Sequence, residues 1–105
     1  MMVGMEPTSL RFARLARSLG EAARSQGLRA PTFRSPPRIP EVTRSIVRRG
    51  PGVTVAVALR GRPWPAVVAD MVEGVVAANR LAGVRADRVR AALWTAVAGG
   101  DEQAA

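Results

Sequence analysis

Apolar residues along the 105-residue chain recur with two spacings, one typical of helices and one of a strand. Residues 8–26 have the helical spacing of three and four, so their apolar positions form one stripe. The stripe consists of Phe12, Leu15, Ala16, Leu19, Ala22 and Ala23. Thr8 or Ser9 can cap the start of a helix here, and Gly27 suits the left-handed position after its end. We therefore predict a first helix over residues 8–26.

Residues 53–60 alternate between strongly apolar and other side chains, which is the spacing of a strand with one buried face. That face carries Val53, Val55, Val57 and Leu59. A lone strand leaves its backbone groups unpaired, and residues 43–49 have the matching length across the Gly-Pro-Gly turn at 50–52. The pattern favours a β-hairpin. The alternative is a helix over residues 40–49 that begins at Pro40.

Two further helices follow, over residues 66–82 and 85–98, and each has one apolar stripe. The stripes consist of Val68, Met71, Val72, Val75, Ala78 and Ala82 in the first and Val89, Ala92, Leu93, Ala96 and Val97 in the second. Gly74 costs about 1 kcal/mol relative to Ala in mid-helix, which indicates that a neighbouring element approaches closely there. Gly83 marks the turn between the helices, and Gly99-Gly100 predicts the end of the second.

The segment 28–40 contains four Pro and three Arg and is predicted to be an extended connector. We expect Phe33 and Ile39 to pin it to the core. The fold class is then α+β, in one small domain over residues 7–99. In chain order it has a basic N-terminal helix, the Pro-rich connector, a two-stranded hairpin and two packed C-terminal helices. The ends expected to be disordered are residues 1–6 and 100–105.

Composition excludes most catalytic chemistry. The chain has no Cys, His, Tyr or Lys, which excludes disulfides, thiolate and imidazole catalysis, Schiff bases and nearly every transition-metal site. Asp70 and Glu73 lie one helical turn apart and could share a proton, but an exposed acidic helix edge explains them more simply. We predict no enzymatic activity, no cofactor and no metal. With neither a targeting segment nor a run of about 20 apolar residues, we expect a cytoplasmic protein without a membrane partner.

The charge pattern points to a polyanionic partner. Sixteen Arg stand against eight acidic residues, which gives a net charge of +8. Residues 7–62 hold twelve Arg and two Glu, whereas residues 63–105 hold four Arg and five acidic residues. A GC-rich coding sequence explains the choice of Arg over Lys, but it supplies acidic codons as well. We therefore predict binding to nucleic acid, DNA or RNA, or to another polyanion.

The candidate phosphate contacts lie in the basic part of the chain. We predict one exposed cluster across the hairpin and a strip on the first helix. The cluster consists of Arg48, Arg49, Arg60 and Arg62, and the strip includes Arg14 and Arg17. The alternative for the strip is a solvated face of an amphipathic helix.

A second candidate is residues 78–93, ANRLAGVRADRVRAAL. Gly83 lies at the turn, and apolar residues follow it one, six and nine positions later, at Val84, Val89 and Ala92. This segment resembles the helix-turn-helix of the lactose-repressor family. The resemblance implies that the second helix faces a DNA groove with Arg85, Ala86, Arg88 and Arg90. Asn79 departs from the motif, which usually has Ala where the helices cross, and the alternative is a plain helical hairpin.

The tetrapeptide Arg60-Gly61-Arg62-Pro63 resembles the core of an AT-hook, which lies extended in the minor groove. The alternative is a turn from strand to helix, with Trp64 packed against the start of the next helix.

Trp94 falls off the apolar stripe of the last helix, on the side of Arg90 and Asp87. An exposed Trp is typical of protein interfaces, which gives a second functional class: an interaction module that forms a homodimer or docks an acidic protein. The alternative is partial burial with Arg90 stacked on the indole.

Overall fold

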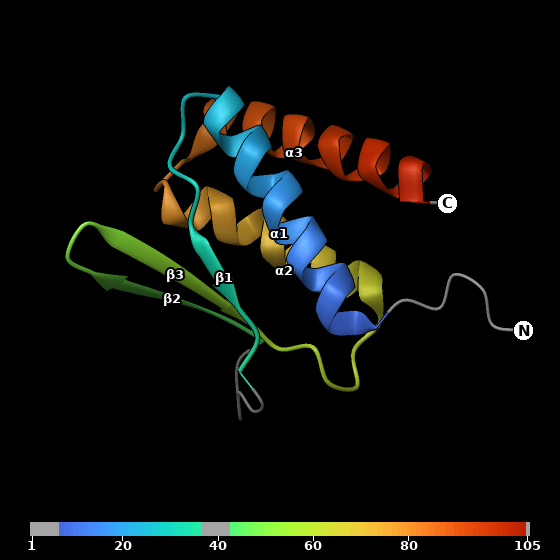
Figure 1. Cartoon of the computed structure of the whole chain (residues 1–105). Coiled ribbons are helices and arrows are strands. Elements are labelled where there is room, and N and C mark those ends of the chain that lie inside the picture. Colours follow the sequence, from blue (N-terminus) through green and yellow to red (C-terminus); the bar gives the residue numbers. More distant parts are fainter. Residues whose placement is uncertain (1–6, 37–42, 105) are drawn as a thin grey trace, which may run out of the picture.

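A computed structural model describes residues 7–36 and 43–104 of the chain. Within these ranges it has three helices and a three-stranded mixed sheet, which confirms the α+β class (Figure 1). The elements are α1 (Thr8–Ser25), β1 (Thr32–Arg34), β2 (Arg44–Arg49), β3 (Gly52–Val57), α2 (Trp64–Ala78) and α3 (Gly83–Ala104).

Helix α1 confirms the first predicted helix. Its stripe is buried at Phe12, Leu15, Leu19 and Ala23. Pro7 occupies the N-cap position and no side chain caps the helix, so the predicted caps at Thr8 and Ser9 are wrong. Gly27 has φ +74°, which confirms the left-handed position after the helix.

The sheet contains one strand more than the sequence predicted. The antiparallel pairing of β2 with β3 confirms the hairpin, so the alternative helix over residues 40–49 is wrong for the described part. On the other edge β1 pairs with β3 in parallel, with Phe33 opposite Val55. Part of the extended connector is therefore a strand. Phe33 packs against the core as expected, and Ile39 lies outside the described residues.

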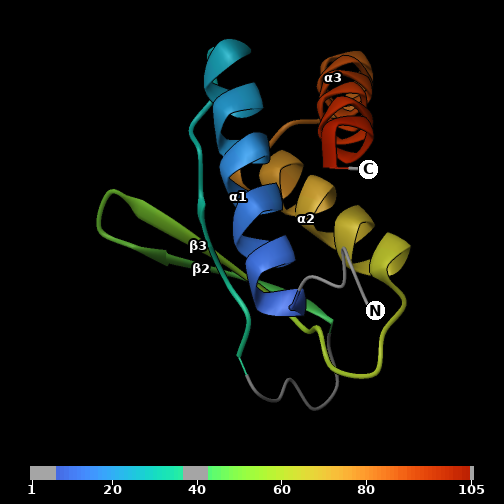
Figure 2. The ribbon, with the colours of Figure 1, turned by 45° about the vertical axis from the view of Figure 1, so that its right-hand side comes forward.

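Helix α2 lies at the centre of the molecule. It packs on β2 and β3 through one side and on α1 and α3 through another. Figure 2 shows the sheet on one side of the molecule and α3 farthest from it. Burial therefore extends beyond the predicted stripe to Val67 and Val76. The helix ends at Ala78, so Ala82 falls outside it.

Helix α3 covers α1 and α2, and it buries Ala86, Val89, Leu93 and Val97. The sequence predicted its end at Gly99-Gly100, but the helix continues to Ala104. A Gly ends a helix when it adopts the left-handed conformation, and Gly99 has no positive φ. Of the helices in the described ranges, none is long and apolar enough to cross a membrane.

Candidate nucleic-acid interface

The four hairpin arginines do not form the predicted cluster. The β2–β3 register places Arg48 opposite Val53 and Arg49 opposite Gly52, next to the hairpin turn. Arg60 and Arg62 follow the opposite end of β3. In an antiparallel hairpin, residues far from the turn on one strand face residues far from it on the other. The prediction of one cluster is therefore wrong.

Arg62 is a half-buried residue with a structural role. Its side chain is 17% exposed, Nη2 lies 2.7 Å from Oδ2 of Asp70, and Nη1 donates to the Ala58 carbonyl at 2.8 Å. Arg44 approaches the other carboxylate oxygen of Asp70 at 3.2 Å. Asp70 is thus not part of an exposed acidic edge, because two arginines enclose it. Its carboxylate ties α2 to β2 and to the loop before α2.

The Arg-Gly-Arg-Pro segment forms a turn from strand to helix, which is the alternative to the AT-hook that the sequence predicted. Gly61 has φ +72°, and the Arg62 N–H donates to the Leu59 carbonyl at 3.2 Å, which closes the turn. Trp64 begins α2 and packs against the core, as that alternative required. The extended conformation that the AT-hook resemblance implied is absent from this segment.

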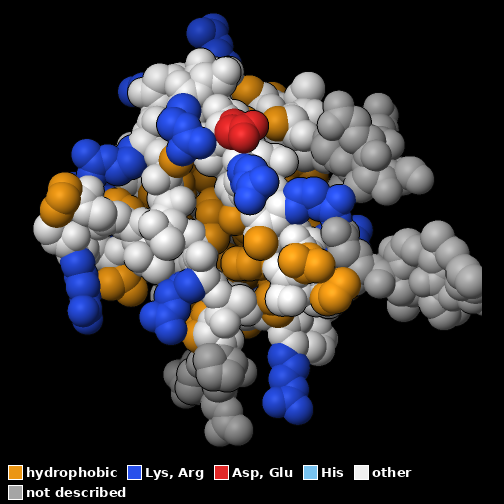
Figure 3. Space-filling model, viewed as in Figure 1, with side chains coloured by type: hydrophobic (Ala, Val, Ile, Leu, Met, Phe, Trp, Pro, Cys, Tyr) orange, Lys and Arg blue, Asp and Glu red, His pale blue; other side chains and the backbone are white. Residues whose placement is uncertain are grey.

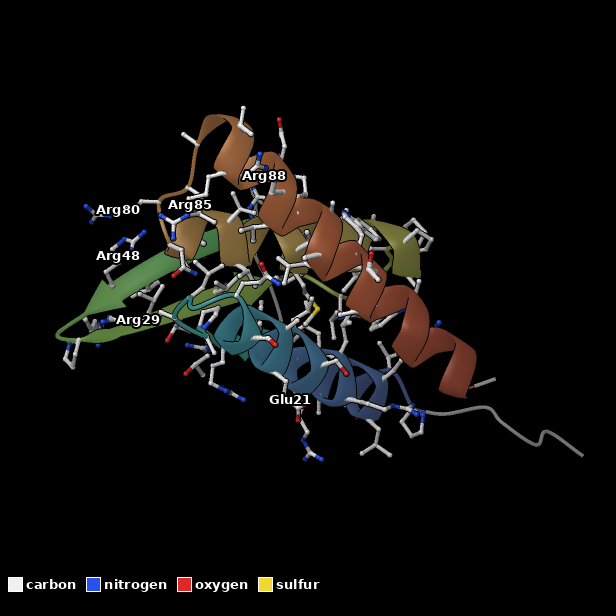
Figure 4. All side chains as sticks on the ribbon, turned by 90° about the horizontal axis from the view of Figure 1, so that it is seen from above. Glu21, Arg29, Arg48, Arg80, Arg85 and Arg88 are labelled. Atoms are coloured by element: carbon white, nitrogen blue, oxygen red, sulfur yellow. The ribbon has the colours of Figure 1, made fainter. Side chains whose placement is uncertain are left out.

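Four arginines instead come together where the hairpin turn meets the C-terminal ends of α1 and α2. We call this surface the basic end; it consists of Arg29, Arg48, Arg80 and Arg85. Arg49 follows Arg48 in β2, so its side chain points to the other face of the sheet. Two of the four are held by the backbone: Arg48 donates to the Ala77 and Ala78 carbonyls at 2.9 and 3.1 Å, and the Arg29 guanidinium donates to the Pro51 carbonyl. Figure 4 shows Arg48, Arg80 and Arg85 at one end of the molecule, with Arg88 further along α3.

Asn79 joins the segments that carry the basic end. Its side chain accepts from the Arg29 N–H at 2.9 Å and donates to the Arg29 and Val75 carbonyls at 2.9 and 3.0 Å. These bonds hold the loop after α1 against the end of α2. The backbone of Arg29, next to Asn79, is thereby fixed beside Arg80.

The acidic side chains of the described residues leave this surface strongly positive. Three of them pair with arginines: Asp70 with Arg44 and Arg62, and Glu73 and Asp87 with Arg90. Glu21 lies on α1 away from Arg48, Arg80 and Arg85 (Figure 4). On the face shown in Figure 3, basic side chains are spread widely and acidic ones appear at a single place.

Arg14 and Arg17, the predicted strip, are both exposed on α1. They lie in the second and third turns of the helix, whereas the basic end begins beyond its C-terminus at Arg29. The structure therefore does not join them to Arg48 and Arg49.

The turn between α2 and α3 departs from a helix-turn-helix. Val84, which the resemblance places in the core, is 66% exposed. Of the residues expected to face a groove, Ala86 is buried and Arg90 is paired with Glu73 and Asp87. Asn79 bonds to the loop after α1 instead of lying at a helix crossing. The plain helical hairpin, the alternative, describes this region.

Replacing Asn79 with Ala is expected to lower the free energy of unfolding by about 2 kcal/mol, because three hydrogen bonds to backbone groups are lost. Urea denaturation measures the change. Thr95→Ala is the control, since it removes one exposed bond to the Ala91 carbonyl and should change little. A gain in stability for Asn79→Ala would contradict this role and favour a crossing that needs a small residue.

Trp94 is 40% exposed on α3, as its position off the stripe predicted. Arg90 does not serve as its stacking partner, because its guanidinium bonds to Glu73 at 2.5 and 3.0 Å and to Asp87 at 2.8 Å. The hydrogen bonds to Glu73 also raise the pKa of Arg90 above its ordinary value. The other Trp does carry a stacked arginine, because Arg11 lies over the Trp64 ring.

Sequence reasoning about phosphate contacts missed Arg29 and Arg80, and it included Arg85 only through the helix-turn-helix resemblance. Arg29 and Arg80 are 51 positions apart in the chain, and only the tertiary contacts of Asn79 bring them together. No local signal was present for Arg80, because it lies within the predicted helix 66–82, whose stripe extends to Ala82. The chain matches no protein family model, no curated protein and no solved structure.

Proposed function

We propose that the protein binds nucleic acid through contacts between the basic end and backbone phosphates, without catalysis. The observation that supports this most directly is the convergence of four arginines on one surface from three separate segments: the loop after α1, β2, and the turn from α2 into α3. Phosphates attract such a surface independently of base sequence, so the chemistry suits DNA and RNA alike.

The anchoring of Arg48 and Arg29 favours binding. A guanidinium has five N–H donors, and Arg48 uses two of them on the last carbonyls of α2. The Ala77 carbonyl also accepts from the Arg80 N–H at 3.1 Å, and the negative end of the helix dipole favours a cation beside both carbonyls. The remaining donors stay available to a phosphate on a side chain that is already ordered, which reduces the entropy lost on binding.

Arg80 gives a second, independent argument. It has φ +53°, the left-handed region, which costs about 1 kcal/mol in a residue other than Gly. Gly would fit this turn with less strain. The chain nevertheless has a long cationic side chain here, on the surface that carries Arg29 and Arg48. Strained positions of this kind are typical of functional sites.

We expect the logarithm of affinity for a DNA duplex or a structured RNA to fall linearly with the logarithm of salt concentration, with a slope of about −4. Arg80→Gly should make the slope shallower by about 1 while keeping or raising the melting temperature, because it removes a charge and relieves strain. Filter binding across a salt series, with thermal melts of both proteins, measures the two effects.

Arg34→Ala is the matched control. Arg34 is an exposed arginine on β1, opposite Ala56 and away from the hairpin turn, so its loss should leave the slope unchanged. No binding at low salt, or equal slopes for both variants, would contradict the proposal. Self-association that Trp94→Ala abolishes, in a protein that binds neither DNA nor RNA, would favour the interaction module instead.

A further inference from the structure

A pocket of about 650 Å³ opens at the other end of the molecule from the hairpin turn. The start of α1, the end of β1 and the loop between β3 and α2 enclose it. The polar and aromatic side chains of its lining are Thr8, Arg11, Ser35, Arg60, Arg62 and Trp64. Neither the basic end nor the proposed function uses these residues.

The lining is cationic and contains no carboxylate. Arg62 is neutralised from behind by Asp70, so the free charge comes from Arg11 and Arg60. The guanidinium carbon of Arg11 lies 4.4 Å from the centre of the Trp64 ring, which fixes this cation at the wall of the pocket. Arg60 is exposed and lines the pocket from the turn between β3 and α2.

Two helix starts add to the positive potential. Helices α1 and α2 both begin at the pocket, after Pro7 and Pro63, and neither has a side-chain cap or an acidic residue in its first turn. Their first N–H groups therefore lack the partners that a cap supplies, and the positive ends of both helix dipoles face this region. Hydroxyl groups at Thr8 and Ser35 offer further donors.

We propose that this pocket binds a phosphate monoester, with the phosphate held between Arg11 and Arg60. The volume exceeds the space that phosphate alone needs and falls in the range of sites for small organic ligands. The stacked pair of Arg11 and Trp64 gives the pocket one flat wall. The ligand is then a small molecule or a strand end that carries a terminal phosphate.

The test uses Trp64 as the reporter in a Trp94→Phe protein, because Arg11 lies directly on the Trp64 ring. We expect adenosine 5′-monophosphate and ribose 5-phosphate to change Trp64 emission with a Kd of about 1 mM or lower. Adenosine, which has no phosphate, should cause no change. Binding should also weaken between pH 7.5 and 5.5, since the second pKa of a phosphate monoester is about 6 and the dianion is the preferred form.

Arg60→Ala should weaken binding at least tenfold, because it removes one of the two cations that hold the phosphate. Arg60 is an exposed turn residue, so its replacement should leave the fold intact. Arg80→Gly and Arg34→Ala should bind as before, which separates this site from the basic end. Equal responses to adenosine and its monophosphate, or full binding by Arg60→Ala with an unchanged melting temperature, would overturn the proposal. A 5′-phosphorylated oligonucleotide that competes with ribose 5-phosphate, when its 5′-hydroxyl counterpart does not, would identify the phosphate source as a strand end.

Discussion

Replacing Asp70 with Ala is expected to lower the free energy of unfolding by about 3 kcal/mol. The carboxylate is 15% exposed and faces Arg62 at 2.7 Å and Arg44 at 3.2 Å. Its removal leaves two guanidinium groups side by side, one of them only 17% exposed, with no counter-charge between them. The contact also joins three parts of the fold, so its loss weakens the attachment of α2 to the hairpin.

Asp87→Ala is the matched control for Asp70→Ala. Asp87 also pairs with an arginine, Arg90, at 2.8 Å, but its side chain is 76% exposed. A pair of this kind on a helix surface contributes less than about 1 kcal/mol. Urea denaturation of the two variants separates a buried charge cluster from a surface pair. Equal and small losses for both would contradict the role assigned to Asp70.

The parts of the fold that depend on neighbours in sequence were predictable. The alternation from Val53 to Leu59 and the turn residues Gly50 and Pro51 together specify a hairpin, because an antiparallel partner can lie directly across a short turn. The third strand could not be predicted in this way. Phe33 pairs in parallel with Val55, 22 positions later, and no local turn sequence signals such a pairing.

The surroundings of the acidic residues of α2 also depend on distant parts of the chain and could not be predicted from the local sequence. A stripe with Asp70 and Glu73 opposite it predicts a surface helix with an exposed acidic edge. The helix is central instead, because the sheet covers one side and two helices cover another. Val67 and Val76 lie off the predicted stripe, and their presence was the available signal that a second face is buried.

The candidate interface depended still more on tertiary contacts. Net charge and its concentration in residues 7–62 predicted a polyanion partner, and that part of the reasoning needs no structure. The choice of residues needed the hairpin register, which separates Arg48 from Arg60, and the bonds of Asn79, which bring Arg29 to Arg80. Charge composition can therefore propose a class of partner, whereas the surface that binds it follows from packing.

Gly74→Ala is expected to destabilise the protein by about 2 kcal/mol, although Ala favours a helix over Gly by about 1 kcal/mol. A Cβ at this position would lie 2.5 Å from Cγ1 of Val55, closer than carbon atoms approach without a shift of one element. Val55 is fully buried in the central strand, so neither the strand nor the helix can yield easily. Thermal or urea denaturation measures the loss.

Two other helical glycines provide controls of opposite sign. A Cβ at Gly20 of α1 would meet Ala30 at an ordinary 3.6 Å, and a Cβ at Gly99 of α3 would meet nothing within 4 Å. Ala at either position should therefore raise the free energy of unfolding by about 0.5 to 1 kcal/mol.

A Val55→Ala background removes the methyl group that obstructs position 74, so Gly74→Ala should cost much less there than in the parent protein. If Gly74→Ala were as stabilising as Gly99→Ala, the close packing of α2 on β3 would be contradicted, because only that contact distinguishes the two sites.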